Sequence, residues 1–86
     1  MHGIFVDLPE VGLAYVAEDG GLWAPKEAVF DRAPRLLLAP FEGKVEGMLF
    51  PAHAAAVYFY QGKPYRVAPE KLVVESGVGY LVLQKV

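Results

Sequence analysis

The sequence has 86 residues, the length of a single domain, and a formal net charge of −2 with acidic and basic residues scattered along it. It has no cluster of Lys and Arg, which excludes the usual phosphate-binding surface of a nucleic-acid-binding protein. It also has no cysteine and no apolar run as long as a membrane-spanning helix, so we expect no disulfide, zinc–thiolate site, thiol nucleophile or membrane insertion.

Gly and Pro divide the start of the chain into short apolar pieces. Residues 3–8 (GIFVDL) are predicted to form a strand, and residues 12–18 (GLAYVAE) a second one. Asp19 and Gly20 favour a tight hairpin turn between them and the next piece, because Gly tolerates a positive φ. Residues 22–25 (LWAP) are then predicted as the return strand.

Residues 24–34 (APKEAVFDRAP) are the one stretch with the signals of a helix. Pro25 suits the first helical position, Glu27 lies in the first turn, and Pro34 would end the helix. Because the stretch is short, a single turn or a strand is also compatible with it.

The second half of the chain reads as further short strands between turn residues. The expected strands are 44–50 (KVEGMLF), 55–60 (AAVYFY), 65–67 (YRV), 71–76 (KLVVES) and 78–86 (VGYLVLQKV). Turns are predicted at 61–64 (QGKP) and at Gly77. Many short strands at this spacing indicate one all-β domain over residues 1–86: a small barrel of short antiparallel strands with at most one short helix.

Reactive side chains are few, and the residues next to them in the sequence include no catalytic partner. His53 would need an orienting carboxylate, a nucleophile or further ligands to act as a general base or to bind a metal, yet three alanines follow it. Ser76 lies between two predicted strands, without the strand-to-helix context of a nucleophilic serine. We therefore interpret both as turn or surface residues and predict no enzyme, no catalytic or metal-binding residue and no cofactor.

Three consecutive aromatic residues, Tyr58, Phe59 and Tyr60, are the most informative group, because side chains alternate between the two faces of a strand. If Val57 and Phe59 point inward, the two tyrosines line the outer face, where Tyr is common in protein interfaces. The alternative is a barrel with both faces partly covered. The candidate protein-binding residues are Phe50, Tyr58, Tyr60 and Trp23.

The composition and the first residues predict an ordered protein, a thermophilic source and a cellular location. Hydrophobic residues make up 55% of the chain, which argues against disorder and favours apolar surface kept for a partner. The absence of Asn and Thr, together with 7 prolines, is typical of proteins from thermophiles. The first residues lack the charged start and apolar core of a signal peptide, so we expect a cytoplasmic protein.

The order of these features resembles a CheW-like domain, the β-barrel adaptor that couples chemoreceptors to a histidine kinase in chemotaxis. The segments that carry the resemblance are 5–31 (FVDLPEVGLAYVAEDGGLWAPKEAVFD), 45–62 (VEGMLFPAHAAAVYFYQG) and 72–86 (LVVESGVGYLVLQKV). The chain is much shorter than a usual adaptor, and Pro51 and Ala52 stand where the family has Arg-Gly in its central turn. The resemblance implies signal transduction, with a histidine kinase or a receptor as the protein partner.

The sequence thus predicts a non-enzymatic protein-binding module, a shortened CheW-like signalling adaptor. Two alternatives stay open: a structural subunit of a homo-oligomer, in which the excess apolar surface is self-complementary, and a small enzyme centred on His53.

Overall fold

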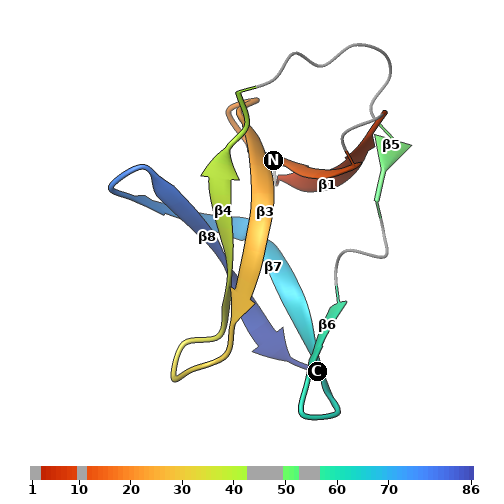
Figure 1. The fold of residues 1–86 in the computed structure, drawn as a ribbon, viewed down its shortest axis with the longest axis vertical. Coiled ribbons are helices and arrows are strands. Elements are labelled where there is room, and N and C mark those ends of the chain that lie inside the picture. The colour runs from red at the N-terminus through yellow and green to blue at the C-terminus, as the bar shows by residue number, and fades with distance from the viewer. Residues whose placement is uncertain (1–2, 10–11, 43–49, 53–56) are drawn as a thin grey trace.

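The computed structural model describes residues 3–9, 12–42, 50–52 and 57–86, without the side chains of residues 50 and 69–71 (Figure 1). Within these ranges the chain forms strands and turns and no helix. The strands are β1 (Ile4–Leu8), β2 (Gly12–Val16), β3 (Leu22–Val29), β4 (Arg35–Pro40), β5 (Phe50–Pro51), β6 (Val57–Tyr60), β7 (Lys63–Glu75) and β8 (Val78–Lys85).

All the strands belong to one antiparallel sheet with the order β5-β1-β2-β3-β4-β8-β7-β6. The sheet curls into a half-barrel, so that its first hairpin and its last hairpin face the same interior (Figure 1). This confirms the predicted all-β class with antiparallel strands. The two ends of the sheet, β5 and β6, follow each other directly in the chain.

Local turn chemistry works as the sequence predicts. In the β2–β3 hairpin, Ala17 N donates to Gly21 O at 2.8 Å, and the Asp19 carboxylate accepts a bond from Gly21 N at 2.8 Å. The β7–β8 turn places Ser76 and Gly77 at φ values of 51° and 78°. Positive φ at both central residues is the mark of a type I′ turn, whose twist matches the strands it joins.

The stretch predicted as a helix, residues 24–34, is instead the body of β3 followed by a turn. Pairing with β4 runs from Trp23 opposite Pro40 to Val29 opposite Arg35, with a register shift between Pro25 and Glu27. The helical signals are wrong here because one proline and a few local preferences are weaker than ladder hydrogen bonds and packing along a whole strand.

Two further strands differ from the prediction. Residues 35–40 (RLLLAP), to which the sequence analysis assigned no element, form β4 in the middle of the sheet, with Leu36 and Leu38 buried. The separate strands 65–67 and 71–76 are wrong, since both belong to the 13-residue strand β7. A register shift between Ala68 and Val73 spans Pro69, which agrees with the confinement of strand prolines to bulges and edges.

The main core lies inside the curl. Its buried residues are Phe5, Tyr15, Ala17, Leu36, Leu38, Val67, Leu81 and Leu83. Phe5 and Tyr15 meet edge to face with ring centroids 5.3 Å apart. A second cluster on the opposite face of β1 and β2 contains Val6, Leu8 and Ala14, with Phe41 packed against it. The β1–β2 hairpin is therefore buried on both faces.

Candidate functional site

β6 directs its side chains opposite to the orientation in which Val57 and Phe59 point inward. Tyr58 packs against the main core, whereas Phe59 is 72% exposed and Val57 is 40% exposed. The register explains this: Tyr58 lies opposite Tyr65 on β7, and Tyr65 shares the inner face with the buried Val67. The interpretation in which Val57 and Phe59 face inward is therefore wrong, and burial raises the pKa of the Tyr58 hydroxyl.

Tyr60 takes part in a contact that ties β6 to a distant strand. Its ring stacks on Phe30, just after β3, with centroids 4.5 Å apart and planes 11° apart. Phe30 also meets Tyr65 edge to face at 5.1 Å. These three rings, here called the aromatic bridge (Phe30, Tyr60 and Tyr65), hold β6 and β7 against the end of β3. One face of the Tyr60 ring is therefore in contact with Phe30 and is not available to a partner.

The other two candidate contact residues have structural surroundings of their own. Trp23 is partly buried against the main core, and its ring covers Gly79, where a Cβ atom would lie 3.0 Å from Trp23 Cζ3. Phe50 pairs with Asp7 through the backbone of β5, but its side chain lies outside the described residues. Their roles in partner binding, and those of Tyr58 and Tyr60, stay predictions.

One side of β6 has no partner strand among the described residues. We call this side, over Val57–Tyr60, the β6 edge. It contains neither a charged residue nor a proline, the two features with which soluble proteins commonly protect an edge strand from association. Its outward peptide groups and the exposed Phe59 together form an unprotected pairing surface.

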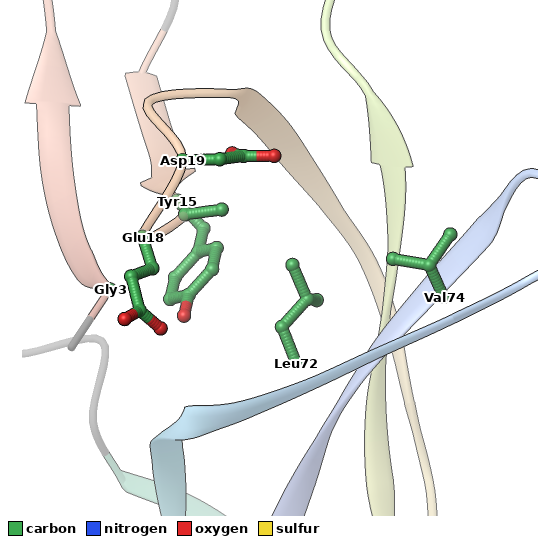
Figure 2. Close-up of a pocket in the computed structure, with 7 residues that line it drawn as sticks. Gly3, Tyr15, Glu18, Asp19, Leu72 and Val74 are labelled. Atoms are coloured by element: carbon green, nitrogen blue, oxygen red, sulfur yellow. The ribbon is translucent and has the colours of Figure 1, made fainter. Parts of the chain in front are cut away.

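A pocket of about 400 Å³ lies at the opposite end of the molecule, between the β2–β3 turn and β7 (Figure 2). Tyr15, Leu72 and Val74 line its interior, and the carboxylates of Glu18 and Asp19 lie at its rim. The Asp19 carboxylate is already used to accept the turn hydrogen bond from Gly21. The pocket offers apolar surface and negative charge.

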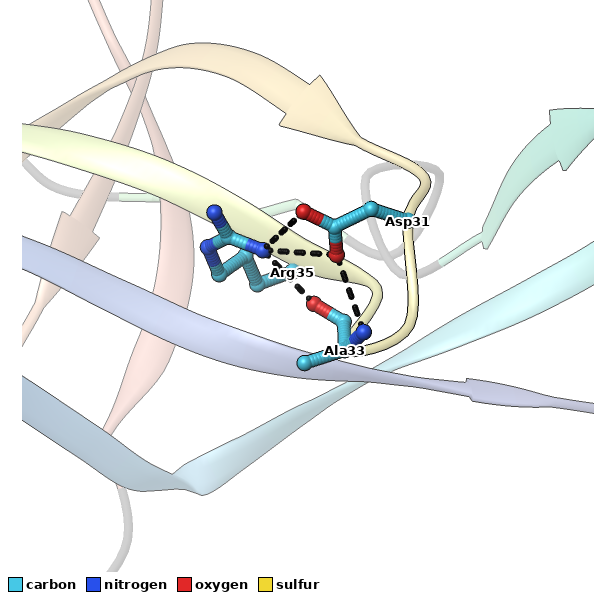
Figure 3. Close-up of polar contacts among 3 residues, drawn as sticks. All are labelled: Asp31, Ala33 and Arg35. Atoms are coloured by element: carbon cyan, nitrogen blue, oxygen red, sulfur yellow. Dashed lines mark hydrogen bonds and ion pairs between the residues drawn. The ribbon is translucent and has the colours of Figure 1, made fainter.

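A cluster of polar contacts lies in the turn that joins β3 to β4 (Figure 3). Arg35 Nη1 donates to both carboxylate oxygens of Asp31, at 2.9 and 3.0 Å, and to Ala33 O at 2.9 Å. The hydrogen bond from Ala33 N, and after it that from Arg35, hold the pKa of Asp31 below its usual value. Because the charges satisfy each other, this cluster serves to shape the turn.

The residues considered for chemistry in the sequence are His53 and Ser76. His53 lies outside the described residues, as do residues 44–49 and 55–56 of the predicted strands. Ser76 lies in the β7–β8 turn, as expected. Among the residues that the structure describes, no group of three or more His, Cys, Asp or Glu side chains could hold a metal ion.

In the same part of the chain, no helix has the length and apolar character needed to cross a membrane. Comparison of the sequence and structure with models of protein families, with curated proteins and with solved structures gives no match. The resemblance to CheW-like domains and the cytoplasmic location thus stay predictions from the sequence. The β6 edge is the surface on which a functional proposal can be built.

Proposed function

We propose that the protein is a non-enzymatic protein-binding module that receives an extended segment of a partner protein along the β6 edge. The observation that carries this proposal is Phe59, a large aromatic side chain that is 72% exposed on an unprotected edge strand.

Binding would proceed by strand addition. The outward peptide groups of β6 would fix the register of the added strand, and its alternate side chains would lie beside Val57 and Phe59 on the outer face. Burial of a Phe side chain is worth about 1.5–3 kcal/mol, which makes Phe59 the anchor of the contact. The aromatic bridge fixes β6 in advance, so the partner would find an ordered strand.

A narrower form of the proposal is a CheW-like signalling adaptor whose partner is a histidine kinase or a receptor. Its support is the sequence resemblance together with the antiparallel all-β half-barrel. Capture of a kinase or receptor by the purified protein would separate this form from a module with another role.

The general proposal is tested by capture of partners from a lysate with the wild-type protein and two variants. Phe59→Lys places a charge on the β6 edge, and Val78→Lys places the same charge at another exposed apolar position, beside the β7–β8 turn. We expect the first variant to lose a partner that the second retains. Hydrogen exchange should then show slower exchange over residues 57–60 when that partner is added. Equal capture by both variants would contradict the proposal.

A self-associating structural subunit is the second candidate, and a specific observation favours it. Large apolar side chains are exposed on several strands: Ile4, Val57, Phe59, Tyr60, Val74, Val78 and Val86. Sedimentation at micromolar concentration distinguishes the two, because a monomer contradicts self-assembly, whereas a dimer that Phe59→Lys dissociates would make a second copy the occupant of the edge.

A further inference from the structure

The parts of β7 and β8 that lie beside the β6 edge, residues 63–68 and 81–85, carry only positive side-chain charges. On β7, Lys63 lies opposite Tyr60 and Arg66 lies opposite Val57, while Lys85 on β8 lies opposite Tyr65. We call Lys63, Arg66 and Lys85 the basic end. All three are exposed, and residues 57–68 and 81–86 contain no Asp or Glu. Arg35, by contrast, is already paired with Asp31 in the β3–β4 turn.

This charge lies close enough to act on an added strand. Neighbouring strands are about 4.8 Å apart, so a strand paired with β6 would lie about 10 Å from β7. That distance is comparable with the Debye length at an ionic strength of about 0.1 M, so the attraction would be felt in solution and would weaken as salt is added.

The two faces of the edge differ in chemistry. The outer face of β6 shows the apolar Val57 and Phe59, with Arg66 of β7 beside Val57. The inner face shows the tyrosines and Lys63, since Lys63 is paired in register with Tyr60. Side chains of an added strand alternate between these two faces. A segment that fits both would carry apolar residues at every second position and acidic residues between them.

From this we infer that the β6 edge takes an acidic extended segment of a different protein, with apolar residues alternating with Asp or Glu. The inference rests on the proposed function and adds the chemistry of the partner to it. The alternation lets apolar residues bury Phe59 on the outer face, while the carboxylates lie on the inner face with Lys63 and Lys85 and within range of the Arg66 charge.

A second copy of this chain is a poorer occupant of the same edge. In a symmetric pair the same patch meets itself, so β6–β6 pairing would bring the basic ends of both copies together and like charges would oppose it. Among the described acidic side chains, Asp7, Glu18, Asp19 and Glu42 belong to β1 and to segments at the opposite end of the long axis (Figure 1), and Asp31 is already paired with Arg35.

The test uses the full chain and three short labelled peptides: alternating Val-Glu, alternating Val-Ser and alternating Val-Lys. Fluorescence anisotropy would give the dissociation constant of each. We expect the Val-Glu peptide to bind about tenfold more tightly than the Val-Ser peptide, since two exposed charge contacts together provide an effect of about this size. The Val-Lys peptide should bind most weakly, and raising the salt from about 0.05 to about 0.5 M should remove the differences.

Matched variants assign the effect to the basic end. Lys63→Ser combined with Arg66→Ser should abolish the preference for the Val-Glu peptide, whereas Lys26→Ser, which removes an exposed cation from β3, should leave it unchanged. Phe59→Lys should weaken the binding of the neutral Val-Ser peptide. Urea unfolding of each variant would show that the fold is intact.

The outcomes separate this inference from the proposed function. Equal binding of the acidic and neutral peptides, lost in Phe59→Lys, would overturn the acidic preference and leave strand addition standing. Binding of no peptide, together with unchanged partner capture by Phe59→Lys, would overturn both. Sedimentation of a dimer that Phe59→Lys dissociates would show a second copy in place of an acidic partner and would also overturn the inference.

Discussion

At one end of the sheet, β5 is only two residues long and contains Pro51, which has no N–H to offer to a further strand. At the other end, β6 is four residues long, three of them aromatic, and contains neither proline nor charge. Short length and proline are common means of preventing edge-to-edge association. Among the described residues, the β6 edge therefore lacks the protection that β5 gives to the other end of the sheet.

The hairpins next to these edges differ in the same way. The β1–β2 hairpin buries apolar side chains on both faces, with Tyr15 in the main core and Val6 in the second cluster. In the β6–β7 hairpin, Tyr58 and Tyr65 pack inward, while Val57 and Phe59 are left exposed on the outer face. The β1–β2 hairpin therefore contributes mainly to the core, whereas the β6–β7 hairpin leaves apolar surface exposed.

The largest expected effect tests whether the β1–β2 hairpin contributes more to stability than the β6–β7 hairpin does. Tyr15→Ala should lower the free energy of unfolding by about 3–5 kcal/mol, because Tyr15 is 1% exposed and its loss leaves a cavity beside Phe5. Phe59→Ala should lower it by less than about 0.5 kcal/mol, as is usual for an exposed side chain. Urea denaturation measures both. Similar losses for the two variants would show that the hairpins do not differ in this way.

The second prediction tests whether the exposed surface of the β6–β7 hairpin binds the proposed partner. Phe59→Lys should weaken binding to the captured partner by about 30-fold, the loss expected when a hot-spot side chain worth about 2 kcal/mol is removed. Val78→Lys should leave the dissociation constant within about twofold, because it alters an exposed apolar position of a different strand. A titration monitored by anisotropy or calorimetry provides the values. Equal weakening by both substitutions would indicate a nonspecific charge effect.

These contrasts also show which parts of the structure can be predicted from the sequence. The turns at Asp19-Gly20 and Ser76-Gly77 are predicted correctly, because turn geometry depends on the residues within the turn. The all-β class follows from many short apolar pieces between such turns. Both results rest on local chemistry.

The predictions are wrong where the structure of a segment depends on pairing with a strand that is distant in the sequence. Residues 24–34 have local helical signals, but pairing with β4 makes them a strand and a turn. β4 itself is a run of three leucines between prolines, which has no periodicity to identify it. The inward direction of Tyr58 depends on its register with Tyr65, and no alternation within β6 alone could supply it.

The direction of the β6 side chains could not be predicted from the sequence of β6 alone. Consecutive aromatic residues direct attention to β6, but the orientation considered for them, with Phe59 inward, is the reverse of the one observed. The basic end was missed because its members are separated along the chain. Lys63, Arg66 and Lys85 gather only through the pairing of β7 with β6 and β8.

The third prediction concerns how the open edge is held in place. Phe30→Ala removes the central ring of the aromatic bridge and should lower the free energy of unfolding by about 1–2 kcal/mol, since each ring contact is worth about 0.5–1.5 kcal/mol. Amide hydrogen exchange should become faster over residues 57–66 before it changes in β1 and β2. Phe30→Tyr, which keeps a ring, is the control. Uniform acceleration across both hairpins would argue against a local role for the bridge.

The smallest effect distinguishes the inner face of β6 from its outer face. Burial raises the pKa of Tyr58 in the folded protein, so folding favours the protonated hydroxyl. Its contribution to stability is complete below the ordinary tyrosine pKa of about 10 and is lost as the pH rises from there through the folded value. Tyr58→Phe should therefore lose less stability than the wild type over this alkaline range, in urea unfolding measured at a series of pH values. The absorbance of ionised tyrosine should show that the variant lacks a late-titrating group. Loss of an early-titrating group instead would place Tyr58 in solvent and reverse the assignment of the faces.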